Sequence, residues 1–270
     1  MATVATLKDR YTEVTQRVAE AAKRAGRSPA DVLVVAVTKY AEPEQVRELI
    51  QLGHMDFGEN KVQQLAQRAA MAQEFLERSI SLRDSGGVPT SANLPESVRW
   101  HMIGRLQRNK VRKAIECARL IHGVDSLRLA EEIQAIALKR DVTVDILLQV
   151  NCSGEKTKGG VAPPAARHLA EQIDTMVNVR LRGLMTMAPH SDNPEDSRFT
   201  FTQCRELFED LRAYNLAEGA FNILSMGMTG DYEVAISEGA NVVRIGSALF
   251  GEPAEHTPDD DDDGEDEGEE

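Results

Sequence analysis

The chain has 270 residues, 41% of them hydrophobic, which is enough to form a sizeable core in one large domain or two small ones. Its formal charge of −13 is concentrated at the C-terminal end, where residues 258–270 carry ten acidic side chains and leave a net charge of −3 for the remainder. The basic residues form no stripe that could follow a phosphate backbone, so we expect no nucleic-acid binding.

Cysteine usage and hydropathy argue against further classes of protein. Cys117, Cys152 and Cys204 are odd in number and lack paired spacing, so neither a disulfide framework nor a metal knuckle is expected. No apolar run approaches the length needed to span a bilayer, and the N-terminal residues lack the apolar core of a signal peptide. We therefore expect a cytoplasmic protein without a membrane segment.

The first predicted element is an amphipathic helix. Apolar residues recur at helical spacing from Leu7 to Ala25, and Gly26 followed by Ser28-Pro29 is a typical stop signal.

After this helix, short apolar runs alternate with helical stretches. Strands are predicted at 32–38, 54–58, 99–103, 119–124, 144–150, 180–186, 221–225 and 242–246. Helices are predicted at 43–51, 60–79, 106–116, 126–140, 163–177, 195–214 and 231–239, with a short one after 246. Eight strand–helix units with nearly continuous apolar strands favour a closed parallel barrel over an open sheet. The predicted fold is α/β, a single (β/α)8 TIM barrel with an N-terminal helix, spanning residues 1–257.

Two segments lie outside this pattern. Residues 81–97 contain several glycines, prolines and serines, which predict a mobile loop inserted before the third strand, away from the active face of a barrel. Residues 258–270 have no apolar side chain to bury and are predicted to form a disordered, solubilising acidic tail.

Lys39 closes the apolar run 32–38 and is the first candidate functional residue. Partial desolvation at a strand end lowers the pKa of an ammonium group, and a neutral amine can attack a carbonyl to form a Schiff base. Most lysines at strand ends point into water, so this position alone is a weak indicator. Two later segments, 224–229 and 242–247, strengthen it, because each is a short strand that breaks into a Gly/Ser turn able to hold a phosphate. Together they indicate a lysine-bound phosphate cofactor.

The candidates fall where a barrel carries its chemistry. In (β/α)8 barrels the active residues follow the strands, and a phosphate site commonly forms after strands seven and eight. Lys39 follows the first predicted strand and Asn60 the second. Ser225 ends the seventh, and Gly246-Ser247 follow the eighth. Glycine permits close approach of the backbone, and amide N–H groups with a hydroxyl form a nest for a dianion.

Arg244 lies inside the eighth predicted strand, between two apolar residues. An unpaired guanidinium in a core is strongly disfavoured, so a partner is required. A cofactor with a pyridine nitrogen would supply one, and a cation beside that nitrogen keeps the ring unprotonated and a poor electron sink. An ion pair with Asp231 or Glu238 is the alternative.

The histidines indicate no further chemistry. His101 is interpreted as a packed, hydrogen-bonded strand histidine rather than a general base. The six histidines show no metal spacing with one another or with the cysteines, so we expect no metal site, and no catalytic residue is assigned.

Six segments, in order along the chain, resemble the pyridoxal phosphate homeostasis proteins, whose fold is similar to the N-terminal barrel of bacterial alanine racemase. The resemblance spans about residues 4–252 and rests on 35–39 (VAVTK), 57–60 (FGEN), 100–110 (WHMIGRLQRNK), 183–188 (GLMTMA), 224–228 (LSMGM) and 243–246 (VRIG). It implies a set of contacts to pyridoxal 5′-phosphate, with Lys39 as Schiff-base anchor, Asn60 lining the pocket, Ser225, Gly246 and Ser247 at the phosphate, and Arg244 at the pyridine nitrogen.

Three positions depart from the family pattern. Lys61 stands where a tyrosine is usual, Thr229 replaces a serine, and Ala240-Asn241 replace a Ser-Thr pair. None of these changes removes an expected cofactor contact.

The resemblance implies a carrier or buffer, not an enzyme, that keeps free pyridoxal phosphate low and delivers it to enzymes that depend on it. The alternative is a weak amino-acid racemase, disfavoured because the sequence after Gly251 offers no second domain to supply an opposing base. A third possibility is a colourless barrel enzyme that forms a Schiff base with a sugar phosphate, but Arg244 would then have no reason to face the barrel mouth. We expect a monomer, because no exposed apolar stripe is evident.

Overall fold

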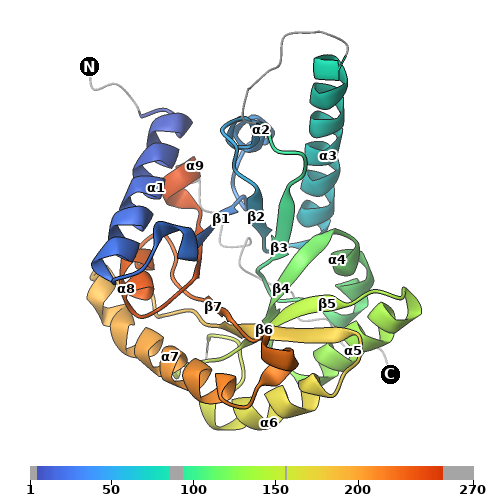
Figure 1. Ribbon diagram of the computed structural model, residues 1–270, viewed down its shortest axis with the longest axis vertical. Coiled ribbons are helices and arrows are strands. Elements are labelled where there is room, and N and C mark those ends of the chain that lie inside the picture. Colours follow the sequence, from blue (N-terminus) through green and yellow to red (C-terminus); the bar gives the residue numbers. More distant parts are fainter. Residues whose placement is uncertain (1–4, 85–93, 156, 252–270) are drawn as a thin grey trace.

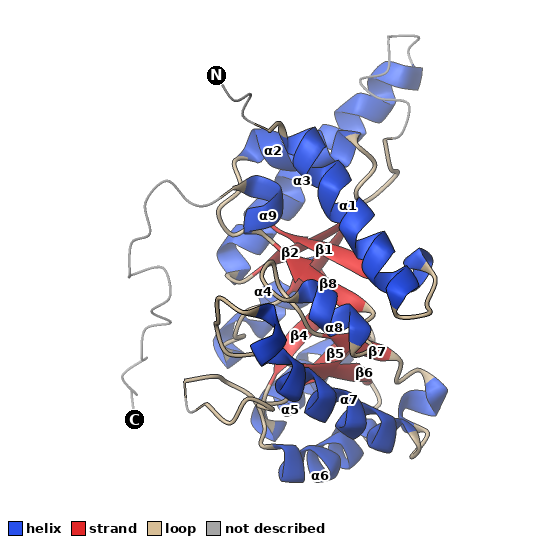
Figure 2. Ribbon diagram, turned by 90° about the vertical axis from the view of Figure 1, so that its left-hand side faces the viewer, coloured by secondary structure: helices blue, strands red, loops and turns tan. Residues whose placement is uncertain are grey.

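The structure is a computed structural model that describes residues 5–84, 94–155 and 157–251. Eight strands form one closed barrel in the order β1 to β8, with parallel pairing throughout. The helices surround this barrel (Figure 1), and the side view shows the strands enclosed between them (Figure 2). The predicted (β/α)8 barrel is confirmed.

All eight predicted strands are present, each within two residues of its expected bounds. They are β1 (Leu33–Val37), β2 (Asp56–Glu59), β3 (Arg99–Met102), β4 (Ala118–Val124), β5 (Val144–Gln149), β6 (Val179–Met185), β7 (Ile223–Ser225) and β8 (Val242–Ile245). The helices are α1 (Leu7–Arg24), α2 (Pro43–Gln51), α3 (Val62–Asp84), α4 (Val111–Cys117), α5 (Leu127–Lys139), α6 (Pro163–Asp174), α7 (Arg198–Arg212), α8 (Tyr232–Ser237) and α9 (Ser247–Phe250). Short 3-10 turns are η1 (Pro29–Asp31), η2 (Arg108–Lys110), η3 (Pro194–Ser197) and η4 (Leu216–Gly219).

Two helices differ clearly from their predicted bounds. α3 continues to Asp84 rather than ending at 79, because no glycine or proline interrupts the sequence before Gly86. The first residues of the predicted 81–97 loop are therefore helical, 94–98 lack regular structure, and 85–93 lie outside the described residues, as do the predicted domain end at 257 and the acidic tail. α4 begins at Val111 because the 3-10 turn η2 precedes it.

Strand alternation decides which side chains enter the barrel. On β8, Arg244 points inward, where its guanidinium meets Ser225 on β7 and the backbone after β6. A small apolar cluster of Leu120, Leu147 and Met185 is separate from the main core. The interior of this barrel is therefore part apolar and part polar, and the polar part includes Arg244.

Helix α1 covers the junction between the last and first units of the barrel. Its N-terminus is closed by a capping box, in which Thr6 Oγ1 accepts the Asp9 N–H and the Asp9 carboxylate accepts the Thr6 N–H. Arg10 Nε donates to the Leu249 carbonyl at 2.7 Å, so α1 holds α9, which lies beside it in both views (Figures 1 and 2). The helix thereby supports the turn after β8.

Within the described ranges, no helix combines the length and the apolar character that crossing a membrane requires.

Candidate cofactor site

Lys39 lies in the turn that follows β1, at the carboxyl end of the barrel, as predicted. Its side chain is half-buried, and Nζ lies 4.6 Å from the centroid of the Tyr40 ring. Tyr40 is itself 38% exposed, so this part of the barrel rim faces solvent. A ligand can therefore reach the rim beside the Lys39 amine.

A buried carboxylate anchors the turn on both sides of Lys39. Glu59 Oε1 accepts the Thr38 hydroxyl at 2.6 Å and lies 2.7 Å from Arg68 Nε. Arg68 Nη2 in turn donates to the carbonyl of Ala41 at 2.7 Å. Burial raises the pKa of Glu59, against the hydrogen bond from Thr38 and the charge of Arg68. The residues before and after Lys39 are thus tied to the end of β2.

Asn60 follows β2 and presents an unsatisfied acceptor. Within the described part of the chain its buried Oδ1 has no hydrogen-bond partner. The backbone here is held closely, because a Cβ on Gly104 would lie 2.2 Å from the Asn60 carbonyl oxygen. A buried acceptor without a partner is unfavourable, which indicates that a ligand or water completes it.

Arg244 is 4% exposed, and both ends of its guanidinium are held by the protein. Nη1 donates to Ser225 Oγ at 2.7 Å, and Nη2 donates to the Thr186 carbonyl at 3.0 Å. Ser225 is fully buried, one step below the turns that follow β7 and β8. Its hydroxyl also lies 3.0 Å from His122 Nδ1. The phosphate role of Ser225 stays a prediction.

The charge of Arg244 is poorly compensated. The ion pairs considered for it, with Asp231 or Glu238, are not formed among the described residues; Glu238 pairs with Arg198 and Arg205 instead. Burial lowers the pKa of Arg244 to about 10, although attraction to the Asp231 charge opposes this shift. A buried cation that a hydroxyl and a carbonyl hold within the described structure is suited to an additional acceptor at the barrel mouth.

The turns after β7 and β8 meet at the same end of the barrel. Gly227 has a φ of +93°, and a Cβ there would lie 2.5 Å from the Ala235 Cβ, so only glycine fits this turn. Thr229 Oγ1 accepts the N–H of Gly246 at 3.3 Å and joins the two turns. In the described structure the N–H groups of Gly227 and Ser247 donate to no protein acceptor. These groups match the nest expected for a phosphate.

The barrel brings the predicted site residues to one end. β1 pairs with both β2 and β8, so Lys39, Asn60 and the Gly246-Ser247 turn follow neighbouring strands. The position of a Cβ on Gly246 would lie 3.5 Å from Val37 Cβ, two residues before Lys39.

Sequence reasoning missed two contributors, Thr229 and His122. In the sequence Thr229 stands out only as a departure from a family serine, whereas in the structure its hydroxyl connects the two turns. His122 lies at an inward position of β4 and contacts Ser225, a position that strand alternation could have revealed. His101 is buried and hydrogen-bonded, so its interpretation as a packed strand histidine is confirmed.

Taken together, the donor set fits pyridoxal 5′-phosphate. It comprises a primary amine, an undercompensated buried guanidinium and two N–H groups without protein acceptors in the described residues. These correspond to an aldehyde, a pyridine nitrogen and a phosphate.

Comparison with known proteins gives the family. The family model described as "Alanine racemase, N-terminal domain" matches residues 11–253. A pyridoxal phosphate homeostasis protein of Aquifex aeolicus is 41% identical over 245 residues, which cover 90% of this chain and 97% of that protein.

Two solved structures place the fold. PipY of Synechococcus elongatus, solved with pyridoxal phosphate bound, is 32% identical with a TM-score of 0.66, and the match covers 88% of this chain and 100% of that one. Alanine racemase of Clostridium difficile, at 15% identity and a TM-score of 0.62, shares the fold over 93% of this chain and 56% of its own. The chain belongs to the family of pyridoxal phosphate homeostasis proteins.

Proposed function

We propose that this protein binds pyridoxal 5′-phosphate at the carboxyl end of its barrel, through a Schiff base on Lys39, and acts in intracellular cofactor homeostasis as a carrier or buffer. The observation that carries the proposal is the undercompensated Arg244, at the end of the barrel where the amine also lies with the two N–H groups that donate to no acceptor among the described residues. The names of the relatives support it, and so does the bound cofactor of PipY.

Each residue has a proposed part in binding. Lys39 supplies the covalent bond, and Asn60 lines the pocket with its Oδ1, which has no partner in the described part of the chain. The Gly246-Ser247 turn holds the phosphate, and Ser225 is proposed to act beside it by holding Arg244. When bound, the cofactor supplies an electrophilic carbon and an electron-withdrawing ring.

Arg244 favours a carrier over a racemase. A guanidinium has donors only, so it keeps a facing pyridine nitrogen unprotonated and leaves the ring a weak electron sink. We expect single enantiomers of amino acids to keep their configuration when incubated with the loaded protein, as followed by chiral chromatography. Rapid interconversion would instead establish the racemase.

The binding test compares two ligands that differ by one group. Titration with pyridoxal 5′-phosphate should produce a saturable yellow absorbance band, and pyridoxal, which lacks the phosphate, should bind at least tenfold more weakly. A protein that stays colourless with both would contradict the proposal and favour a Schiff-base enzyme of sugar phosphates.

Cytoplasmic enzymes that depend on the cofactor are the proposed recipients, and the proposed carrier is a monomer. Loaded protein should reactivate such an apoenzyme, and light scattering should give the mass of one 29.7 kDa chain. A dimer mass would contradict the second statement.

A further inference from the structure

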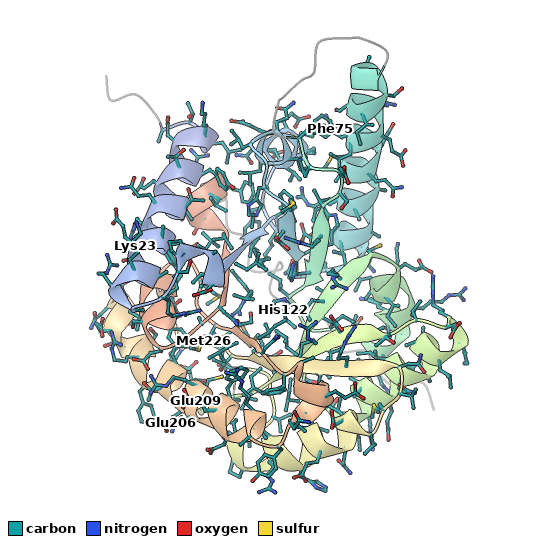
Figure 3. The ribbon with its side chains drawn as sticks, in the orientation of Figure 1. Lys23, Phe75, His122, Glu206, Glu209 and Met226 are labelled. Carbon is teal, nitrogen blue, oxygen red and sulfur yellow. The ribbon has the colours of Figure 1, made fainter. Side chains whose placement is uncertain are left out.

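A chain of buried polar side chains leads from Arg244 across the inside of the barrel. Arg244 Nη1 lies 2.7 Å from Ser225 Oγ, and that oxygen lies 3.0 Å from His122 Nδ1. His122 Nε2 lies 2.9 Å from His101 Nδ1, and His101 Nε2 lies 3.2 Å from Asp56 Oδ1. All five residues are at most 4% exposed, and Figure 3 marks His122 among the strands in the middle of the molecule.

In the first half of this hydrogen-bonded chain, the donor at the Arg244 end is fixed by chemistry. A guanidinium has no acceptor, so Ser225 Oγ must accept from Arg244. The Ser225 hydroxyl proton then needs an acceptor, and His122 Nδ1 is the one that the described structure offers. With the Ser225 hydroxyl as the donor, His122 carries its proton on Nε2.

The second half continues in the same direction. Burial, together with the positive charge of Arg244, lowers the pKa of His122 well below its ordinary value, so the ring is neutral. Its Nε2–H donates to His101 Nδ1, and His101 Nε2–H donates to Asp56. Burial alone would raise the pKa of Asp56, but hydrogen bonds from His101 and Arg99 outweigh it and keep the carboxylate ionised.

The hydrogen-bonded series has a cation, Arg244, at one end and an anion, Asp56, at the other. These two charges lie at opposite ends of the barrel. Asp56 begins β2 and is held by Arg99, which begins β3 and whose side chain is 44% exposed. Arg244 and Ser225 lie near the carboxyl ends of β8 and β7. Rotation of either imidazole ring would break two hydrogen bonds of this series. The Asp56 carboxylate therefore fixes the orientation of the whole hydrogen-bonded series.

We propose that Asp56, His101 and His122 are positioning residues of the cofactor site: they fix the Ser225 oxygen as an acceptor and so hold Arg244 as a donor toward the cofactor ring. The cofactor part of this inference rests on the proposed function. The donor-to-acceptor direction of the hydrogen bonds does not rest on the proposed function, since it is a property of the protein alone.

The protein offers a matched control for Asp56 at the same end of the barrel. Asp145 on β5 is 5% exposed and is held by Arg180 at 2.7 Å and Arg182 at 2.8 Å. Among the described residues it has no hydrogen bond to a histidine. Asp56→Asn and Asp145→Asn each remove one buried carboxylate that arginines hold, but only the first interrupts the path to Arg244.

The first measurement uses the protein without cofactor. Two-bond 15N–1H correlation spectra should show His101 and His122 as neutral rings protonated on Nε2 in the wild type and in Asp145→Asn. In Asp56→Asn the His101 pattern should change, because the carboxylate that selects its tautomer is gone. An Nδ1–H ring for either histidine in the wild type would overturn the proposed direction.

The second measurement is the dissociation constant of pyridoxal 5′-phosphate. We expect it to rise about tenfold in Asp56→Asn, the size of one hydrogen bond to a charged group, and to stay within twofold in Asp145→Asn. Should Asp56→Asn fail to fold, His122→Phe, which fills a similar volume without ring nitrogens, should show the same rise.

Equal affinity in the wild type and the interrupted variant would overturn the positioning role. If the wild type forms no adduct on Lys39, the proposed function fails, whereas the histidine tautomers of the cofactor-free protein still decide whether the directed chain exists.

Discussion

At the scale of single residues, the site depends on backbone turns as much as on side chains. Gly227 and Gly246 shape the two turns that follow β7 and β8, and the Thr229 hydroxyl joins them. Both turns leave an N–H group that lacks a protein acceptor in the described structure. Substitutions that move this backbone should therefore affect phosphate binding before they affect the amine of Lys39.

Gly227→Ala tests this dependence. Its φ of +93° and the 2.5 Å approach to Ala235 make a side chain unfavourable, so we expect a loss of about 2 kcal/mol in the free energy of unfolding and weaker cofactor binding. Gly230→Ala is the matched control, because a Cβ at Gly230 would meet no atom within 4 Å. Urea unfolding and cofactor titration of both variants check the prediction; equal stability of the two variants would contradict it.

Sequence reasoning found the positions of the site residues better than their partners. Lys39, Asn60 and Arg244 could be placed because strand ends can be counted along the chain. The contacts of Arg244 with Ser225 and Thr186 depend on how β6, β7 and β8 align, which the sequence of any one strand does not specify. The Asp231 and Glu238 alternatives were reasonable by charge alone, and packing directed Glu238 to other arginines.

At the scale of elements, the N-terminal helix α1 packs against the last two helices of the barrel, α8 and α9. It holds α9 through Arg10 and α8 through ion pairs of Arg17 and Arg24 with Glu233, each at 2.6 Å. These ion pairs are partly exposed and contribute little by themselves. The stability of α1 itself therefore matters for the turn between β8 and α9.

Thr6→Ala should lower the free energy of unfolding by about 1 kcal/mol, because the Asp9 N–H at the start of α1 loses its acceptor. Thr12→Ala, an exposed position in the same helix, should change it by less than about 0.5 kcal/mol. Thermal and urea unfolding compare the two; a Thr12→Ala effect as large as that of Thr6→Ala would argue against the cap.

The element bounds show where local sequence rules apply. The strands were predicted well because buried parallel strands are continuous apolar runs bounded by polar turns. α4 was predicted too early because 106–110 has helical composition but forms a loop and the turn η2. In that region the backbone is constrained by Gly104, which must pass close to Asn60, a contact between segments that are distant in sequence.

At the scale of the whole molecule, counting strand–helix units was enough to predict barrel closure, but not the polar path through the barrel. Asp56, His101, His122, Ser225 and Arg244 come from five strands spread over most of the chain. Each looks like an isolated polar residue in its own strand. Only closure of β8 onto β1 brings them into one connected interior.

Buried neutral histidines make the stability of the fold dependent on pH. Burial lowers the pKa of His54, and burial with the positive charge of Arg244 lowers that of His122 well below its ordinary value of 6.5. Below pH 6.5 the unfolded chain binds protons that the folded protein does not, so the free energy of unfolding falls by up to about 1.4 kcal/mol per pH unit for each histidine. Their contribution is fully present above this pH.

His54→Gln should reduce this pH dependence. Between pH 7.5 and 5.5, the loss of stability measured by urea unfolding should be about 1 kcal/mol smaller than in the wild type, because one histidine no longer titrates on unfolding. His168→Gln, at an exposed position, is the control for the loss of an imidazole from the surface. An identical pH dependence in His54→Gln and the wild type would show that His54 is not held neutral.

Borohydride reduction of the protein incubated with pyridoxal 5′-phosphate, followed by peptide mass mapping, tests directly whether Lys39 anchors the cofactor. We expect a phosphopyridoxyl group on Lys39 and its loss in Lys39→Ala. Lys61→Arg, which alters a different amine, the one that follows β2, should retain the group on Lys39. Absence of the adduct, or an adduct on a different lysine, would show that the turn after β1 does not anchor the cofactor.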